Sequence, residues 1–420
     1  MTKNEIVETA FRVWGRDFYF HTSLSNLASE LGVCKQALYR HFLNKNDLLE
    51  TMANHFLDDF AGFLQKDYQT ALTLEDKTEC IFTITRSIIE YYARNSDYFI
   101  FAMVKLHDRE LDNVKIADEF RVRGVDFLKF RQSISKNYAF TPLVMRLIFT
   151  TLTFYVAGFH KMGIQTAKQQ PSEAAIVKII GVIGEIVGKG LGYTREEIDS
   201  LDFERLEKVI IGAADDITDD PLLKAVAGAV AEAGPWEASM EQVARRSGLS
   251  KSSLYCHFKS KQDMLQQLFM TEFMRIINFS RQGIRQSEVP QEQLYLGIFS
   301  IAEYLRSKPD ILITFDWIRN RKLNFNPGGK KPPKPEFESL RLFEEIEIKP
   351  LLNPESPFTE TSLSSWILFL IVNTLMRTSG GQELGQAASS DIRQLYRLIT
   401  LGIGGFEIGD RGKYCIMEVN

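Results

Sequence analysis

A stretch of 27 residues occurs twice in the chain, and this repeat constrains the fold more than any other feature. Residues 23–49 (SLSNLASELGVCKQALYRHFLNKNDLL) align without a gap on residues 239–265 (SMEQVARRSGLSKSSLYCHFKSKQDML) after a shift of 216 positions. Eleven of the 27 aligned positions are identical, and roughly 150 residues follow each copy. We therefore interpret the chain as a tandem duplication of one unit.

Each copy has the local signals of two short helices joined by a tight turn. In the second copy, Ser239 and Gln242 are spaced as a capping box, which satisfies free backbone N–H groups at the start of a helix. Gly248 suits the left-handed backbone of a sharp turn. Ser250 and Ser260 lie at positions that cap the next two helices. The pattern predicts a helix-turn-helix, whose second helix fits the major groove of DNA.

Both stretches resemble the DNA-binding head of the TetR (tetracycline repressor-like) family of transcriptional regulators. The resemblance rests on the string L-Y-x-H-F-x-x-K at 38–45 and 254–261, and on an Ala-x-x-x-Gly segment at 28–32 and 244–248. It implies an all-α fold of two tandem units, each a three-helix head followed by a helical ligand-binding and dimerisation body. Family members are homodimers whose last two long helices form a four-helix interface. Because one chain here holds both sets of helices, we expect an intramolecular pseudo-dimer, and further dimerisation stays open.

The chain is expected to divide into five segments, and strand signals are few. These are a first helix-turn-helix domain at 1–50, a first helical regulatory domain at 51–193, a helical linker at 194–218, a second helix-turn-helix domain at 219–266 and a second helical regulatory domain at 267–420. Apolar residues at helical spacing predict further helices at 5–16, from 44, 74–94, 98–107, 116–135, from 142, from 172, 264–281, 291–306, 309–321, 336–347, 361–377 and 389–401.

Two glycine-rich segments need an explanation. Gly181, Gly184 and Gly188 interrupt the helix predicted from residue 172. Since glycine costs a helix about 1 kcal/mol relative to alanine, they suggest a close approach by another helix. An ordinary buried helix with a glycine-rich end is the alternative. Residues 326–335 (NPGGKKPPKP) are interpreted as a solvated connection, with contact to a partner as the alternative.

Positive charge is concentrated in the repeated stretches, although the net charge of the chain is −4. Residues 32–46 hold three basic residues and no acidic one, and residues 245–262 hold five and none. DNA phosphates should therefore lie against these stretches. The residues expected to contact DNA are Ser23, Lys35, Gln36, Tyr39, Arg40, His41 and Lys45 in the first head, and Ser239, Lys251, Ser252, Ser253, Tyr255, His257, Lys259 and Lys261 in the second.

The expected DNA contacts divide into base reading and phosphate binding. Bases should be read from the exposed first turn and outer face of each recognition helix, because Gln pairs with adenine edges and Arg or Lys with guanine. Lys45 and Lys261 begin the fourth helix of each unit, where free N–H groups and the helix dipole also attract phosphate. Tyr39 and Tyr255 either bind phosphate through the hydroxyl or only pack.

Some positions depart from the family pattern or allow a second interpretation. The family places the histidine of the string, His41 and His257, near phosphate, although a histidine on a helix surface is the simpler alternative. Cys34 stands where the family usually has a hydroxyl cap, and Cys256 replaces the arginine of the first copy. The base contacts of each head are therefore left open.

The resemblance also implies a cavity for a small apolar or aromatic effector among the body helices. Aromatic residues at helical spacing are more often core residues, so both interpretations stand. The candidates are Tyr92, Phe99, Met103, Phe154, Tyr155, Phe299, Trp317, Phe343, Trp366 and Phe369.

The sequence contains no signal for catalysis, a cofactor or a metal site. It has no GxSxG, HExxH or phosphate-loop motif, and its six histidines are scattered. The four cysteines lie far apart, which is typical of reduced thiols in the cytoplasm, with a redox switch at Cys34 and Cys256 as the alternative. The N-terminal segment is amphipathic and unlike a signal peptide, and the apolar run at 366–376 is too short to span a bilayer. We therefore expect a cytoplasmic protein that is not an enzyme and has no membrane partner.

The leading hypothesis is a ligand-responsive transcriptional regulator, a repressor by resemblance, that binds a double-stranded DNA operator with two non-identical heads. The alternative is a small-molecule-binding or protein-interaction scaffold whose heads no longer bind specific DNA. The basic runs in both heads favour the first hypothesis, since loss of DNA binding would permit acidic residues there.

Overall fold

The computed structural model describes residues 2–16, 19, 23–106, 113–166, 171–214, 220–322, 341–348, 358–376 and 389–408. Within these residues the regular secondary structure is helical. Strand-like pairing in the same residues is limited to one antiparallel bridge between Tyr138 and Glu407. The prediction of an all-α fold is confirmed.

The first half begins with a three-helix head and continues into a helical body. The head consists of α1 (Lys3–Arg16), α2 (Leu24–Glu30) and α3 (Lys35–Leu38). The body consists of α5 (Lys77–Arg94), α6 (Ser96–Phe101), the π-helical turn η1 (Ala102–Leu106), α7 (Asn113–Val122), α8 (Phe127–Ile134), α9 (Pro142–Thr166) and α10 (Glu173–Lys189). The long helix α4 (Lys45–Thr73) leads from the head into the body and so belongs to both.

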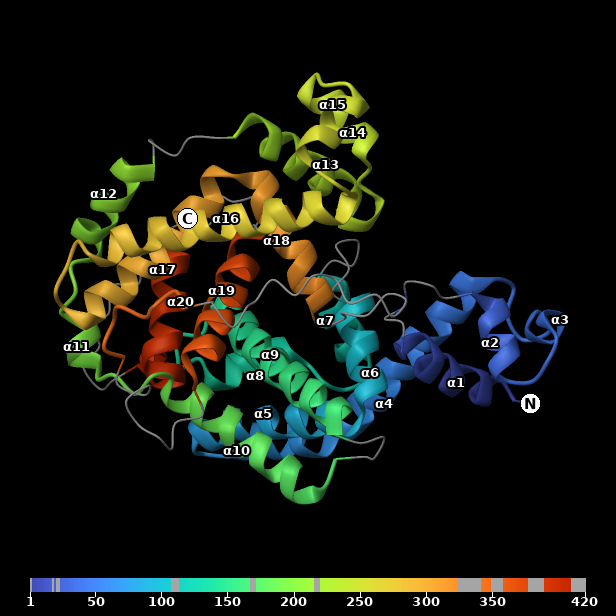
Figure 1. Cartoon of the computed structure of the whole chain (residues 1–420). Coiled ribbons are helices and arrows are strands. Elements are labelled where there is room, and N and C mark those ends of the chain that lie inside the picture. Colours follow the sequence, from blue (N-terminus) through green and yellow to red (C-terminus); the bar gives the residue numbers. More distant parts are fainter. Residues whose placement is uncertain are drawn as a thin grey trace.

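The second half repeats this order after two connecting helices, α11 (Arg195–Asp199) and α12 (Phe203–Ala214). Its head consists of α13 (Pro221–Glu237), α14 (Met240–Ser247) and α15 (Lys251–His257), and α16 (Lys261–Ile284) corresponds to α4. The body consists of α17 (Pro290–Ser307), α18 (Pro309–Lys322), α19 (Glu360–Met376), α20 (Ser389–Leu401) and the short 3₁₀ helix η4 (Gly402–Phe406). Figure 1 shows the two heads at separate corners of one shared mass of body helices.

Helix boundaries follow the side chains that cap them. Asp76, Ser172 and Asp220 accept hydrogen bonds from backbone N–H groups in the first turns of α5, α10 and α13. Each cap satisfies N–H groups that have no partner within the helix. The helix start predicted near residue 172 is therefore explained by local chemistry.

Two predicted helices differ from the structure. The helix expected at 116–135 is broken into α7 and α8, because Gly124 has a φ of 86°, a left-handed conformation that ends a helix. Of the helix expected at 336–347, residues 341–347 are not helical, with turns at 342–345, and the remainder lies outside the described residues. The loop predicted at 326–335 also lies outside them.

Four helices, α9 and α10 from the first half and α19 and α20 from the second, pack together where the halves meet. The ring centroids of Phe154 and Phe369 are 5.3 Å apart, and those of Tyr155 and Trp366 are 6.0 Å apart. The indole N–H of Trp366 donates to Thr151 Oγ1 at 3.2 Å. The chain therefore forms the predicted pseudo-dimer within itself.

Close backbone approach in this bundle occurs at Gly190 and Gly402, and of the three predicted glycines only Gly188 takes part in it, 2.6 Å from a Cβ placed on Gly402. A Cβ on Gly190 would lie 2.7 Å from the backbone nitrogen of Gly402, and a Cβ on Gly402 would lie 2.5 Å from the carbonyl oxygen of Val187. Both glycines have positive φ. By contrast, nothing lies within 4 Å of a Cβ placed on Gly181 or Gly184, so the close approach predicted there is wrong. A Cβ placed on Gly188, the third of the set, would lie 3.0 Å from the ring of Phe82.

The connecting helix α12 is anchored to the second body. Arg393 of α20 donates two hydrogen bonds to the carboxylate of Glu207, at 2.7 and 2.8 Å, and the Tyr295 hydroxyl donates to the same carboxylate at 2.5 Å. Glu207 is 6% exposed, so this charge is held by paired donors and not by water. These contacts fix α12 against α17 and α20 of the second half.

One helix among the described residues, at 142–161 in α9, is long and apolar enough to cross a membrane by length and composition. Half of that segment is buried inside the structure. Its position in the bundle between the halves accounts for the apolar composition.

Candidate nucleic-acid interface

The second head has the capped helix-turn-helix that its sequence predicts. The Ser239 hydroxyl accepts from the backbone N–H of Gln242, and the Gln242 side chain accepts in return from the N–H of Ser239 at 2.7 Å. Gly248 ends α14 with a φ of 70°. The Ser250 hydroxyl then caps α15 by accepting from the N–H of Ser253 at 3.0 Å. The recognition helix α15 is thereby fixed at its N-terminus.

The first head has the same turn but a weaker recognition helix. Gly32 has a φ of 67°, and Ser23 caps α2 by accepting from the N–H of Asn26. Cys34, at the position of Ser250, makes no side-chain cap. The recognition helix α3 extends over four residues, whereas α15 extends over seven. The missing hydroxyl at Cys34 is the local difference that accompanies the shorter helix.

Replacing Cys34 with serine is expected to stabilise the first head by about 1 kcal/mol, because the backbone already has the geometry of a cap. The φ and ψ angles of Cys34 are −75° and 152°, against −72° and 156° for Ser250. Slower amide hydrogen exchange over residues 35–38 would report the new cap. Ser250→Ala is the matched control and should speed exchange in α15. Unchanged exchange in Cys34→Ser, alongside a clear effect of Ser250→Ala, would contradict the explanation.

The outer faces of both recognition helices are open to solvent. Leu38 and Leu254 are fully buried and hold α3 and α15 against their heads. Tyr39 and Tyr255 are 47% and 50% exposed, so these rings are only half covered by packing. The predicted base-reading residues are all exposed: Lys35, Gln36, Arg40, Lys251, Ser252 and Ser253. Each head therefore presents these side chains to solvent.

The starts of α4 and α16 are built alike. Asp47 and Asp263 each accept a hydrogen bond at 2.7 Å from the backbone N–H four residues earlier, at Leu43 and Lys259. The side chain of Leu43 is 84% exposed, whereas its equivalent in the second head is the exposed ammonium of Lys259. The two heads therefore present different chemistry at the same corner.

The remaining predicted contact residues differ in how freely they face solvent. Lys45 and Lys261 are partly buried, and burial lowers the pKa of Lys261 while Glu237 counteracts that effect. His257 is exposed and His41 is partly buried. The hydroxyls of Ser23 and Ser239 donate to side chains of their own helices, at 2.8 and 3.0 Å, in addition to capping them.

The predicted effector residues that the structure describes lie in several places. Tyr92 and Phe99 pack together at 5.4 Å and Met103 is buried on the following turn, all in the first body. Phe299 and Phe343 are buried in the second body. The residues that belong instead to the bundle between the halves are Phe154, Tyr155, Trp366 and Phe369. The side chain of Trp317 lies outside the described residues.

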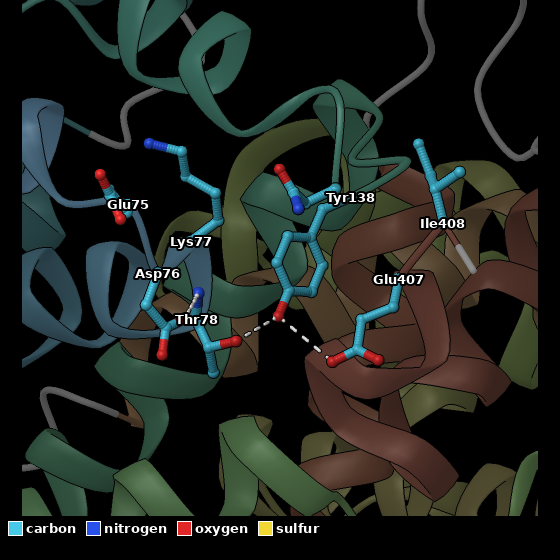
Figure 2. Close-up of a pocket in the computed structure, with 8 residues that line it drawn as sticks. Glu75, Asp76, Lys77, Thr78, Tyr138, Glu407 and Ile408 are labelled. Atoms are coloured by element: carbon cyan, nitrogen blue, oxygen red, sulfur yellow. Dashed lines mark hydrogen bonds between the residues drawn. The ribbon is translucent and has the colours of Figure 1, made fainter. Parts of the chain in front are cut away.

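A polar cavity of about 260 Å³ between the halves was not anticipated from the sequence. Its lining residues are Glu75, Asp76, Lys77, Thr78, Asn137, Tyr138, Glu407 and Ile408. Figure 2 shows the hydroxyl of Tyr138 between Thr78 Oγ1, at 2.8 Å, and a carboxylate oxygen of Glu407, at 3.3 Å. Burial raises the pKa of this hydroxyl. No sequence signal predicts the cavity, because it depends on pairing of residues 137–139 with residues 406–408.

Comparison with known protein families gives a match to each head. Residues 6–52 and 222–268 both match the profile of the bacterial regulatory proteins of the tetR family. No curated protein matches the chain. The two matches coincide with the two capped helix-turn-helix units described above. The chain is a DNA-binding transcriptional regulator of the TetR family with two tandem TetR-like halves.

Proposed function

We propose that this regulator is a ligand-responsive repressor in which one chain places two non-identical heads on one operator. The observation that carries the proposal is a pair of exposed, differently composed recognition surfaces joined through one intramolecular four-helix bundle. In this proposal the DNA-binding domains are residues 1–50 and 219–266, the regulatory domains are 51–193 and 267–420, and 194–218 is the linker.

The residues of each head are assigned separate tasks. Base reading falls to Lys35, Gln36 and Arg40 in the first head and to Lys251, Ser252 and Ser253 in the second. Their exposure on α3 and α15, and for Arg40 in the turn after α3, supports this assignment. Phosphate binding falls to Tyr39, His41, Lys45, Tyr255, His257, Lys259 and Lys261. Ser23 and Ser239 support DNA binding by capping α2 and α14.

Selection of bound sequences from random DNA with the whole chain tests the proposal. A regulator with two working heads should enrich two short motifs at a fixed spacing, and its affinity should fall steeply with salt because phosphate contacts release counterions. A scaffold that no longer binds specific DNA should enrich no motif. Enrichment of a motif without salt dependence would also contradict the proposed phosphate contacts.

Lys261→Ala is expected to weaken binding to all DNA sequences about equally and to reduce the salt slope by roughly one unit. The reason is the position of Lys261 at the N-terminus of α16, where backbone N–H groups also favour an anion. Affinities for specific and unrelated DNA over a series of salt concentrations measure the effect. Lys45→Ala provides the matched change in the first head. Relaxed preference at one base pair would instead assign Lys261 to base reading.

We place an effector site of the first half next to Tyr92, Phe99 and Met103. His160 lies against this group, with its Nε2 2.8 Å from the carbonyl oxygen of Tyr92, and burial lowers the pKa of its imidazole. The ring centroids of Phe99 and His160 are 5.4 Å apart. A neutral imidazole among aromatic side chains suits a small apolar or aromatic molecule that carries few polar groups.

A hydrophobic compound that binds there is expected to weaken DNA binding by about 5- to 150-fold, the usual range for coupling between two sites. A thermal-shift screen of hydrophobic metabolites and drugs identifies binders, and DNA affinity is then measured with each binder at saturation. Compounds that cause no thermal shift serve as controls. A compound that stabilises the protein and leaves DNA affinity unchanged would count against the coupling.

A further inference from the structure

The two halves hold their head-bearing helices, α4 and α16, with different chemistry at equivalent positions. A shift of 213 residues aligns α5 with α17, and α6 with the start of α18. Tyr91 then corresponds to Tyr304. The Tyr91 hydroxyl donates to Asp59 of α4 at 2.8 Å, and the Tyr304 hydroxyl donates to Glu272 of α16 at 2.6 Å. Asp59 is exposed, whereas Glu272 is only 2% exposed. The second contact is therefore made in the dry interior.

Buried charges surround this contact in the second half. Besides the Tyr304 hydroxyl, the Glu272 carboxylate contacts a guanidinium nitrogen of Arg275 at 2.8 Å and the ammonium of Lys308 at 3.7 Å. Lys308 is 8% exposed and lies over the Tyr304 ring, 5.1 Å from its centroid. It precedes α18, at the corner between α17 and α18.

The first half lacks this buried ion pair. The shift of 216 residues that aligns the two heads also aligns α4 with α16, and it makes Phe56 the equivalent of Glu272. The shift of 213 makes Asn95 the equivalent of Lys308. The side-chain amide of Asn95 donates to the carbonyl oxygen of Tyr91 at 2.9 Å. The ring of Phe56 stacks on that of Phe60, with 5.6 Å between the ring centroids. Apolar packing and a neutral amide tolerate small rotations that a buried ion pair does not.

The same corner in the second half also reaches the helix-turn-helix. Asp310 of α18 and Arg246 of α14 both approach Gly228 of α13. A Cβ on Gly228 would be 2.9 Å from Arg246 Nη1 and 3.3 Å from Asp310 Oδ2. Arg246 also pairs with Glu232 of α13 at 2.6 Å. The absence of a side chain at Gly228 therefore lets the corner aspartate face a helix of the DNA-binding unit.

In the first half, the equivalent aspartate faces a different helix. Asp97 corresponds to Asp310, and its charge interacts with Arg12 and Arg16 of α1. Arg16 pairs with Glu30 at 3.1 Å. These two residues align with Glu232 and Arg246, so the same ion pair occurs in both heads with the acidic and basic residues exchanged. Each body thus packs on the first helix of its head, α6 on α1 and α18 on α13. In the second half the corner aspartate also lies close to Arg246 of the helix-turn-helix.

We propose that the α17–α18 corner, with Lys308 and Asp310, is a positioning element that holds the second head in one orientation on its body. Rotation of α16 would separate Glu272 from Lys308 and leave a buried charge without a partner, which is costly. The second head is therefore a fixed anchor on the operator, and the first head is the one that adjusts its position. The consequence for DNA binding rests on the proposed function, whereas the distance measurement described below is made without DNA.

The test replaces the two buried ion-pair residues of the second half by their equivalents in the first, with Glu272→Phe and Lys308→Asn combined. The double variant should stay folded, because removing both partners of a buried ion pair is much less costly than removing one. Spin labels on the exposed thiols of Cys34 and Cys256, with Cys415 replaced by serine, report the distance between the recognition helices without DNA. Tyr91→Phe is the matched change in the first half.

The distance distribution is expected to broaden in the double variant and to stay unchanged in Tyr91→Phe. The operator is first selected with the natural chain, and the half-site of the second head is identified as the one whose protection is lost in Lys251→Ala. The double variant should bind this half-site about tenfold more weakly, within the range usual for coupling residues. A folded double variant with an unchanged distribution would overturn the proposal. If the double variant does not fold, Tyr304→Phe removes one hydrogen bond only, and an unchanged distribution in that variant would overturn the proposal equally.

Discussion

A palindromic operator built from two copies of the half-site of the first head is expected to bind the chain about 100-fold more weakly than an asymmetric operator that carries one half-site for each head. The reason is that the second recognition helix carries Ser252 and Cys256 where the first head has Gln36 in α3 and Arg40 in the turn that follows α3. A well-placed bidentate side chain contributes about 1–3 kcal/mol of discrimination between bases, so two mismatched positions account for the loss. Competition binding with both operators, and the mass of each complex, measure the effect.

A variant with two like heads supplies the control. Ser252→Gln, Ser253→Ala and Cys256→Arg give α15 the reading residues of α3, and this variant should prefer the palindrome. All three side chains are exposed, so the changes leave the packing of the head intact. Two chains of the natural protein on one short palindrome would refute the single-chain arrangement, whereas one chain on the asymmetric site supports it.

The heads could be predicted because their determinants are local. A capping serine, a glycine with positive φ and a buried leucine each act within one turn of helix, as Ser239, Gly248 and Leu254 show. Their order along the sequence is therefore enough to define the helix-turn-helix. The difference between Cys34 and Ser250 was likewise visible in the sequence, and its consequence for α3 follows from the same chemistry.

The contacts between the halves could not be predicted, because they join residues more than 200 positions apart. Phe154 and Trp366 have the spacing of core residues, and periodicity alone does not say whether a core lies within one body or between two. Glycines show the same limit. Gly181 and Gly190 look alike in sequence, yet only the backbone around Gly190 meets another segment. The cavity beside Tyr138 depends on such a long-range pairing as well.

Gly190→Ala is expected to destabilise the protein by about 2–6 kcal/mol, the sum of left-handed strain and overpacking against backbone. The backbone N–H of Leu191 donates across the halves to the carbonyl oxygen of Ile399 at 2.8 Å, and the N–H of Tyr193 donates to that of Thr400 at 3.2 Å. A Cβ on Gly190 would lie against Ile399 and 2.7 Å from the nitrogen of Gly402, so the junction must open. Urea denaturation of the natural chain and the variant measures the loss.

Gly192→Ala separates the two contributions. Gly192 has a φ of 73°, yet nothing lies within 4 Å of the position of its Cβ, so this variant carries the strain without the clash. Its expected cost is about 1–3 kcal/mol. Gly402→Ala should resemble Gly190→Ala, because Gly402 approaches Val187 and Gly188 of the first half in the same way from the other side. If Gly190→Ala and Gly192→Ala cost the same, close approach at Gly190 does not hold the halves together. A larger loss in Gly190→Ala and Gly402→Ala than in Gly192→Ala assigns the difference to the junction on which the single-chain pseudo-dimer depends.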